Sequence, residues 1–154
     1  VFQSSQFTGG SDISADGSKV IFMSMEDGER DVWTVGSDGS NPVNITPETT
    51  GIGMNNPVFS PDGTKIAYNA WDPGTNTDGI WIMNADGTNR TKLAGADNVF
   101  CESFSSDGKW VIYTDASAAN DQIVMVRADG SGFKKVVYTE SNDELGWVGT
   151  PIIR

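Results

Sequence analysis

The chain has 154 residues and a formal net charge of −11, with 21 acidic residues, 10 basic residues and no histidine. So acidic a composition disfavours nucleic acid and anionic membrane surfaces as partners, and no apolar run approaches the roughly 20 residues of a membrane span. The absence of histidine excludes a Ser-His-Asp triad, a Cys-His pair and any metal site with a histidine ligand. The single cysteine, Cys101, cannot form an intrachain disulfide, and we expect it to be a buried apolar residue.

Along the chain, a unit of roughly 45 residues occurs three times. Each unit contains a Ser-x-Asp-Gly sequence and, further on, a second Asp-Gly pair; these lie at 14–17 and 38–39, 60–63 and 86–87, and 105–108 and 129–130. Tight hairpins need positive φ at their centre, which Gly, Asp and Asn tolerate best. We therefore interpret the six aspartates as turn residues. Two interleaved hairpins per unit are typical of a propeller blade.

Apolar and β-branched segments flank these turns and predict four antiparallel strands per unit. In chain order the expected strands are 12–14, 19–23, 31–35 and 41–46, then 57–60, 65–68, 79–83 and 89–93, and finally 103–105, 110–113, 122–126 and 133–137. The strand before the first turn of each unit is expected to be the shortest. Trp33 and Trp81 occupy equivalent strand positions, so we interpret both as core residues between blades.

The predicted fold class is therefore all-β, a β-propeller of four-stranded antiparallel blades within one partial propeller domain, residues 1–154. The expected blades span approximately 7–46, 53–94 and 99–139. Residues 147–154 correspond to the first strand of a fourth blade, because Gly149–Ile153 aligns with Asn55–Phe59.

The segments Pro57–Tyr68 and Ile80–Gly87 closely resemble the TolB-like repeat, also called WD40-like. The first and third units depart from it by Ala15 and Ser106 at the position of Pro61. This family resemblance covers nearly the whole chain and implies a propeller of six or seven blades, as in TolB or in propeller domains attached to some peptidases. It says little about function, since one scaffold hosts many roles.

Three blades and one strand leave a ring open, because known propellers hold four to eight blades. Two explanations are open. The chain is a fragment of a longer propeller with six to eight blades, or two chains associate head to tail as a homodimer that closes one six-bladed ring. Either arrangement would cover sheet faces that are otherwise exposed to solvent.

The long loops opposite the Asp-Gly turns carry most of the remaining carboxylates, so we expect a strongly negative face there, which we call the top. Most Lys and Arg residues, Lys92 among them, are expected near the opposite face, the bottom. A hard cation such as calcium prefers carboxylate oxygens from such loops. The candidate calcium ligands are Asp27, Asp31, Asp78, Asp115 and Asp121, although no EF-hand spacing is present.

The axial channel of a propeller is lined by the first strand of each blade and its approach. The candidate ligand-binding residues there are Asp12, Asn55, Asn56 and Glu102. Binding of ordered water by these side chains is an equally good interpretation. Trp71 and Asp72, in the irregular loop 69–79, form a candidate recognition site outside the channel.

No catalytic residue is indicated, and the sequence favours a non-catalytic scaffold that binds a protein or peptide through its acidic loop face and channel mouth, where a cationic partner would be suited. The TolB-like resemblance implies a bacterial envelope protein, periplasmic or extracellular. The alternative is a propeller segment of a larger secreted peptidase or carbohydrate-active enzyme, with its catalytic residues outside this chain. A glycosidase with paired carboxylates is less favoured, because no pair is singled out.

Overall fold

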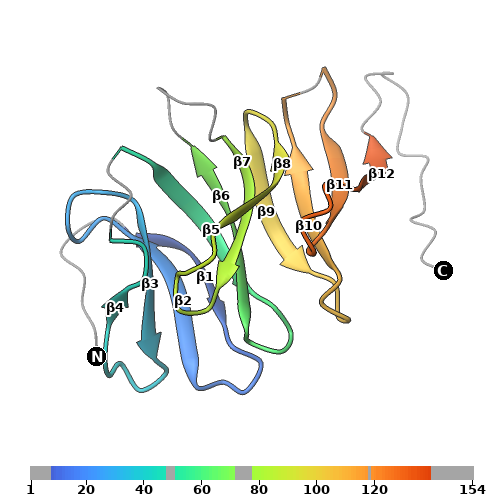
Figure 1. The fold of residues 1–154 in the computed structure, drawn as a ribbon. Coiled ribbons are helices and arrows are strands. Elements are labelled where there is room, and N and C mark those ends of the chain that lie inside the picture. Colours follow the sequence, from blue (N-terminus) through green and yellow to red (C-terminus); the bar gives the residue numbers. More distant parts are fainter. Residues whose placement is uncertain (1–7, 48–50, 72–77, 118, 140–154) are drawn as a thin grey trace, which may run out of the picture.

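A computed structural model describes residues 8–47, 51–71, 78–117 and 119–139, which form twelve β-strands and no helix within those ranges. The strands make three four-stranded antiparallel sheets, shown side by side in Figure 1. Blade 1 contains β1 Thr8–Ile13, β2 Lys19–Ser24, β3 Asp31–Gly36 and β4 Val43–Asn44. Blade 2 contains β5 Gly53–Phe59, β6 Lys65–Trp71, β7 Gly79–Asn84 and β8 Thr91–Gly95. Blade 3 contains β9 Val99–Phe104, β10 Trp110–Asp115, β11 Gln122–Arg127 and β12 Lys134–Thr139.

Within each blade the strands follow one another in chain order. The first strands of the three blades lie together, because β5 contacts β1 on one side and β9 on the other. This arrangement confirms the predicted all-β propeller with four-stranded antiparallel blades. The segment 147–154, expected to begin a fourth blade, lies outside the described residues.

The expectation that the first strand of each blade is the shortest is wrong. β1 and β9 have six residues and β5 has seven, whereas the outermost strand β4 has only two. We call the first strand of each blade its inner strand. The register of each inner strand is irregular, and this interrupts the alternation of apolar and polar residues from which strand length is predicted.

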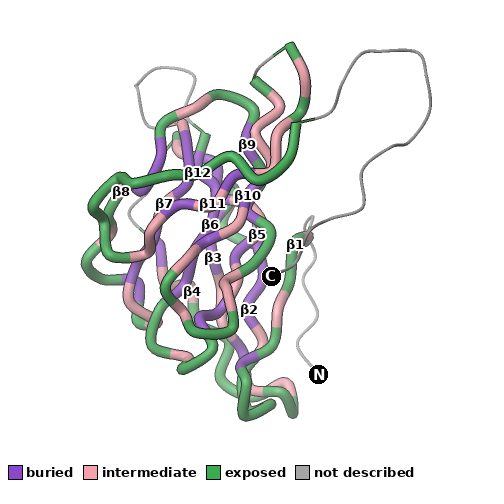
Figure 2. The backbone as a smooth tube through the Cα atoms, turned by 90° about the vertical axis from the view of Figure 1, so that its right-hand side faces the viewer, coloured by how far each residue is buried: buried purple, intermediate pink, exposed green. Residues whose placement is uncertain are grey.

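The hydrophobic core lies between blades, as it does in stacked-repeat proteins. Figure 2 shows the buried residues along the strands and the exposed ones mainly in turns and loops. Ile21 and Val32 of blade 1 pack against blade 2 in one cluster, whose fully buried members from blade 2 are Ile66 and Met83. A second cluster joins blades 2 and 3 and includes Cys101, which is 3% exposed, as expected for a structural thiol. Burial raises the pKa of this thiol, so it stays protonated.

Trp81 confirms its assignment as an inter-blade core residue, because it packs against the cluster between blades 1 and 2. Trp33 is half-buried at the equivalent position of blade 1. No helix among the described residues is long and apolar enough to span a membrane.

Candidate functional site

The six aspartates of the Asp-Gly pairs lie in turns, as predicted, and local hydrogen bonds hold their carboxylates there. In the first turn, the Ser14 hydroxyl donates to Asp16 Oδ1 (2.7 Å), and so does the Ser18 amide (3.0 Å). Ser60 and Thr64 repeat this arrangement around Asp62. These hydrogen bonds, the serine hydroxyl's first, lower the pKa of both carboxyls from 3.8 to about 2. The turn aspartates therefore serve the fold.

Two of the predicted calcium ligands, Asp27 and Asp31, are brought together by an asparagine. The Asn44 amide donates to Asp27 Oδ2 at 2.6 Å and to Asp31 Oδ2 at 2.9 Å. The Thr46 hydroxyl donates to Asp31 Oδ1 at 3.0 Å, and Asp31 is only 2% exposed. This network fastens the end of blade 1's outer strand to β3, so Asp31 has a structural role whether or not a cation binds.

The other predicted calcium ligands lie apart from this network. Asp115 accepts hydrogen bonds from the amide and the hydroxyl of Ser117, which closes its own loop. Asp121 is exposed and Asp78 is half-buried. Across the described ranges, no three acidic, cysteine or histidine side chains are grouped so that they could hold a metal ion. Calcium binding remains a prediction.

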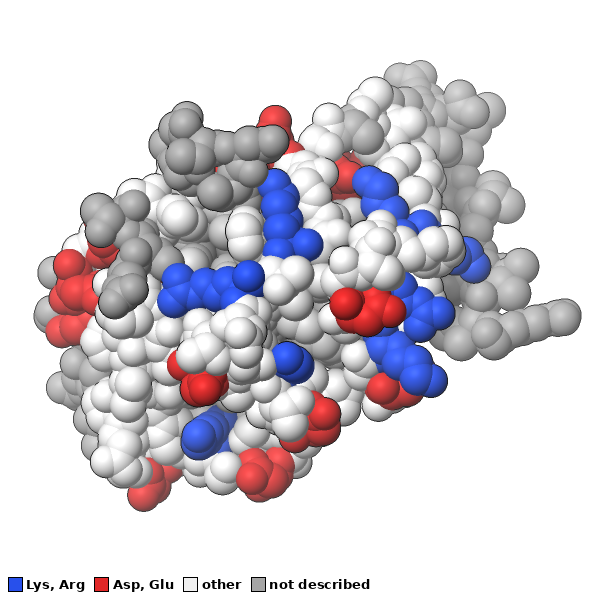
Figure 3. All heavy atoms as spheres, in the orientation of Figure 1, with Lys and Arg blue, Asp and Glu red and all other residues white. Residues whose placement is uncertain are grey.

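Charged side chains are distributed less simply than the sequence suggests. Figure 3 shows several acidic side chains along the lower edge of the molecule, where the Asp-Gly turns lie, and Lys and Arg side chains spread above them. Lys92 is expected near the turns, but its ammonium end lies beside Gly95, at the loop end of β8. The side chain reaches there because β8 leads away from the turn, and a lysine extends several ångströms along the strand.

The inner strands carry a β-bulge at nearly the same place in all three blades. The extra residues are Gly10 in β1, Asn56 in β5 and Glu102 in β9. Gly10 has φ +49°, and a Cβ built on it would lie 2.9 Å from the Asn56 backbone. Only glycine therefore permits this approach of blade 1 to blade 2. Bulges of this kind redirect side chains and are common beside binding sites.

Asp12, a predicted ligand-binding residue, is engaged with the backbone. Its Oδ2 accepts a hydrogen bond from the Phe59 amide of blade 2 at 2.8 Å, and its Oδ1 accepts one from the Ile13 amide. Asn69 makes a comparable link further along, because its Oδ1 accepts from the Cys101 amide of blade 3 at 3.4 Å. Sequence reasoning missed both links, since the partners lie far apart in the chain.

A hollow of about 270 Å³ lies where the inner strands of the three blades meet. Its walls include the carboxylates of Asp12 and Glu102 and the apolar side chains of Ile13 and Phe104. Glu102 is exposed and accepts a hydrogen bond from the Thr114 hydroxyl at 3.1 Å. The predicted residues Asn55 and Asn56 lie on β5 and are half-buried. A cationic group next to an apolar one would suit this lining.

The Trp71 side chain is 52% exposed at the end of β6. Its ring lies beside Gly53, which the aliphatic part of Arg30 approaches from blade 1. Trp71 is thus available for contact at the loop end of the first blade junction, while its predicted neighbour Asp72 lies outside the described residues.

Sheets set side by side with their first strands along one axis define the class of this protein as a β-propeller. No model of a known protein family matches the chain. A curated relative, a TolB homolog of Chlorobium luteolum, is 28% identical over 128 residues, which are 82% of this chain and 28% of that protein. The structure of a protein identified as TolB in Agrobacterium tumefaciens superposes with a TM-score of 0.73 at 20% identity, over 89% of this chain and 48% of that chain. These matches confirm that the repeats are TolB-like.

Propellers of enzymes have the same fold. An oligogalacturonate lyase in complex with manganese matches with a TM-score of 0.63 at 17% identity, over 90% of this chain and 43% of the lyase. The propeller domain of the Trilobed protease from Pyrococcus furiosus matches with a TM-score of 0.64 at 13% identity, over 90% of this chain and 44% of that domain's chain. The chain spans less than a third of its curated relative and under half of each of these solved chains.

Proposed function

We propose that this propeller segment is a non-catalytic scaffold that binds a protein or peptide carrying a cationic side chain at the mouth of the axial channel. The observation that carries the proposal is the hollow between the inner strands, where the exposed Glu102 carboxylate lies beside apolar side chains. Glu102, which is the bulge residue of β9, lines this hollow. The exposed carboxylates of the top loops would attract a cationic partner over a longer range.

Binding of a short fluorescein-labelled peptide of alternating Lys and Ala residues tests this proposal by anisotropy. The wild-type chain should bind it, and Glu102→Gln should weaken binding about threefold to fivefold, as expected for an exposed ion pair. Asp97→Asn is the matched control, since it removes an exposed carboxylate that does not line the hollow. Equal binding of a Glu-Ala peptide, or an equal effect of both variants, would contradict the proposal.

We also propose calcium as a ligand of the top loops, held by a single carboxylate such as Asp121 together with loop carbonyl groups, since no three acidic side chains of the described residues are grouped. Isothermal titration with calcium chloride tests it. We expect the wild-type chain to give a heat of binding that Asp121→Asn does not give. If the wild-type chain gives no heat at millimolar calcium, the calcium proposal is wrong.

The similarity to the lyase and the protease supports a second candidate, a propeller that positions substrate for a catalytic domain elsewhere in a longer protein. This chain has no histidine, so it cannot itself supply a histidine ligand or a histidine base. The complete reading frame decides between the two candidates, because a catalytic domain following the propeller would favour the enzyme.

The TolB-like repeats support a bacterial envelope location, periplasmic or extracellular, which fractionation of the native host would test. A second copy of the chain is a further candidate partner, because three blades are half of a six-bladed ring.

A further inference from the structure

The inner strand of each blade has one edge that no strand of its own blade covers. In β5 the Ser60 amide donates into its own sheet at 2.9 Å, and in β9 the Ser105 amide does the same at 2.9 Å. Backbone groups of an antiparallel strand alternate in direction from one residue to the next. The preceding residues, Phe59 and Phe104, therefore direct their N–H and C=O groups outward, away from their own blade.

The Asp12 carboxylate satisfies two of these outward amides. Its Oδ2 accepts a hydrogen bond from the Phe59 amide of blade 2 at 2.8 Å, and its Oδ1 accepts one from the Ile13 amide of its own strand at 2.8 Å. Ile13, Phe59 and Phe104 hold equivalent positions, because each is paired with the second residue of the next strand. One carboxylate thus binds the outward amides of the first two blades.

The equivalent amide of blade 3 lacks such an acceptor. Val58, directly before Phe59, corresponds to Asp12, and its partly buried side chain packs against the core between blades 2 and 3. Blade 2 therefore presents no carboxylate to the Phe104 amide from this position. In the described part of the chain, this amide donates to no other group. The Phe104 amide is thus a donor that a ligand can use.

Phe104 borders the hollow of about 270 Å³, together with Val58 and Glu102. Val58 supplies an apolar wall, and the exposed Glu102 carboxylate supplies a negative charge. All three residues belong to the described blades 2 and 3. An open strand edge is a template for a further strand. Peptides bind proteins by adding such a strand, with main-chain hydrogen bonds for affinity and side-chain contacts for specificity.

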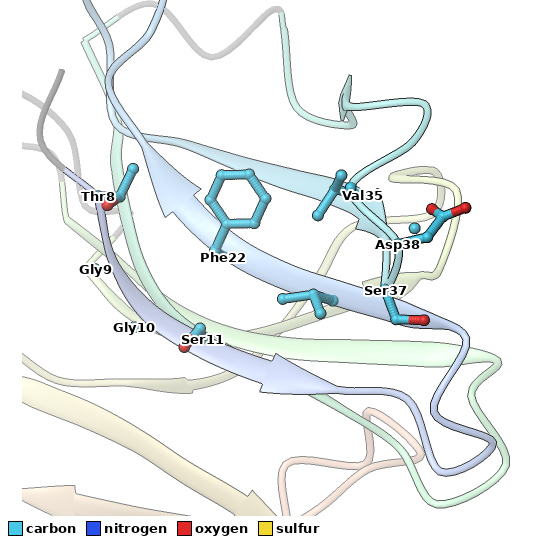
Figure 4. Close-up of a pocket in the computed structure, with 11 residues that line it drawn as sticks. Thr8, Gly9, Gly10, Ser11, Phe22, Val35, Ser37 and Asp38 are labelled. Carbon is cyan, nitrogen blue, oxygen red and sulfur yellow. The ribbon is translucent and has the colours of Figure 1, made fainter. Parts of the chain in front are cut away.

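A larger hollow, of about 550 Å³, has different walls. It lies on blade 1, with Phe22 and Val35 among its lining residues (Figure 4). Both are on strands that pair on two sides, β2 and β3, and the carboxylate of this hollow, Asp38, accepts a hydrogen bond from the Ser40 amide of its own turn. The hollow at Phe104 is the better site for a peptide backbone, since it adds an open amide whose equivalent in blade 2 already binds an acceptor.

We infer that an extended peptide segment with a Lys or Arg side chain pairs with β9 at Phe104. Its backbone carbonyl accepts from the Phe104 N–H, its N–H donates to the Phe104 carbonyl, and its cationic side chain lies at Glu102. The Phe59 amide of β5 does not compete, because Asp12 holds it. The neutral carbonyl of a peptide suits this place better than a carboxylate, which Glu102 would repel. The inference rests on the proposed scaffold function and deepens it, since it names the strand edge that orients the peptide.

Backbone-methylated peptides test the pairing. Alternate amides of an extended peptide point to opposite sides. Two versions of the fluorescein-labelled Lys-Ala peptide, one N-methylated at every Ala and one at every Lys, are therefore matched controls for each other. Loss of a hydrogen bond should weaken binding of one version about fivefold, while the other binds like the unmodified peptide. If neither version loses affinity, or if both lose it equally, the strand pairing is wrong. If the unmodified peptide does not bind, the proposed function itself fails.

Val58→Asp tests the same amide without a peptide. It provides blade 2 with the carboxylate that Asp12 provides in blade 1, so hydrogen exchange at Phe104 in the free chain should slow about fivefold. Val58→Thr is the matched control, because it is similar in size to valine and has no carboxylate, and it should leave this exchange unchanged. Native circular dichroism and unchanged exchange at Phe59 show that the variants fold. No slowing at Phe104 in folded Val58→Asp would mean that the amide does not face position 58, and the inference would be overturned.

Peptide binding to Val58→Asp separates pairing from simple attraction of charge. The added negative charge would by itself strengthen binding of the cationic Lys-Ala peptide. A carboxylate that occupies the Phe104 amide should instead weaken binding about fivefold, because the peptide carbonyl loses its donor. Weaker binding to Val58→Asp than to Val58→Thr supports the inference, and equal or stronger binding overturns it.

Discussion

At the Asp-Gly turns, each aspartate binds the hydroxyl of a serine two residues earlier or of a residue two positions later. These carboxylates are exposed, yet their ionised form is favoured in the folded chain. The pKa of Asp62 falls to about 2 chiefly because the Ser60 hydroxyl donates to it at 2.6 Å. The same chemistry in three blades links the acid stability of the whole molecule to its turns.

Asp62→Asn should therefore lower the melting temperature at pH 6 and leave a smaller difference from wild type at pH 2. A carboxyl whose pKa is depressed on folding stabilises above its ordinary value near 3.8, and that stabilisation is lost as the pH falls toward about 2. Thermal melts between pH 6 and pH 2 measure the effect. Asp97→Asn serves as control outside the turns, and an unchanged gap from wild type across the whole range would contradict the assignment.

Tyr113 is fully buried between blades 2 and 3, and its hydroxyl has no hydrogen-bond partner in the described structure. Burial, followed by the nearby Asp115 carboxylate, raises its pKa to about 12, so it stays neutral. Tyr113→Phe should leave the free energy of unfolding unchanged or raise it by up to about 1 kcal/mol, because a buried unpaired hydroxyl costs free energy. Urea unfolding measures this, and a loss of more than about 1 kcal/mol would show that the hydroxyl has a partner.

At the scale of the elements, two turn glycines with similar φ have different surroundings. Gly63 has φ +69°, and a Cβ added to it would meet nothing within 4 Å. Gly87 has φ +87°, and a Cβ there would lie 1.9 Å from the Ile45 carbonyl oxygen of blade 1. The turn after β7 thus lies in close contact with the end of blade 1 at Ile45. Arg90, which donates to the Gly87 carbonyl at 3.1 Å, follows it at the same junction.

Gly87→Ala should destabilise the protein by roughly 2–4 kcal/mol, since it adds a clash between blades to the cost of positive φ. Gly63→Ala, the matched control, should cost only about 1–2 kcal/mol, because it carries the backbone cost alone. Denaturant unfolding of both variants gives the comparison. Equal losses of stability in the two variants would mean that the turn at Gly87 does not contact blade 1.

These elements also show what the sequence could predict. Turn geometry is local, so Ser14–Gly17 and its repeats indicate the blades directly. The contact of Asp12 with Phe59 spans 47 residues and that of Asn69 with Cys101 spans 32, so neither follows from spacing. The bulges at Gly10 and Asn56 interrupt the alternating pattern, which is why the inner strands are longer than expected. The sequence shows Asp31 as a loop carboxylate, but not that the side chains of Asn44 and Thr46 donate hydrogen bonds to it.

At the scale of the whole molecule, the blades are coupled through side chains that reach backbone amides of the next inner strand. The Asp12 carboxylate accepts a hydrogen bond from the Phe59 amide of blade 2. Phe59 lies on β5, the edge strand of its sheet, and its amide is on the side where no other strand of blade 2 pairs with β5. In an array whose repeats contact only their neighbours, such a link sets how far one blade can open independently of the next.

Asp12→Ala should thus lower the free energy of unfolding by about 1–2 kcal/mol, because it leaves the Phe59 amide without its acceptor. Native-state hydrogen exchange should show faster exchange at Phe59 and at neighbouring amides of β5, while β10 and β11 in blade 3 keep their protection. Asp12→Asn retains one acceptor oxygen and should restore part of the protection at Phe59. If exchange at Phe59 is the same in wild type and Asp12→Ala, or if all three blades lose protection equally, coupling between blades 1 and 2 does not depend on this carboxylate.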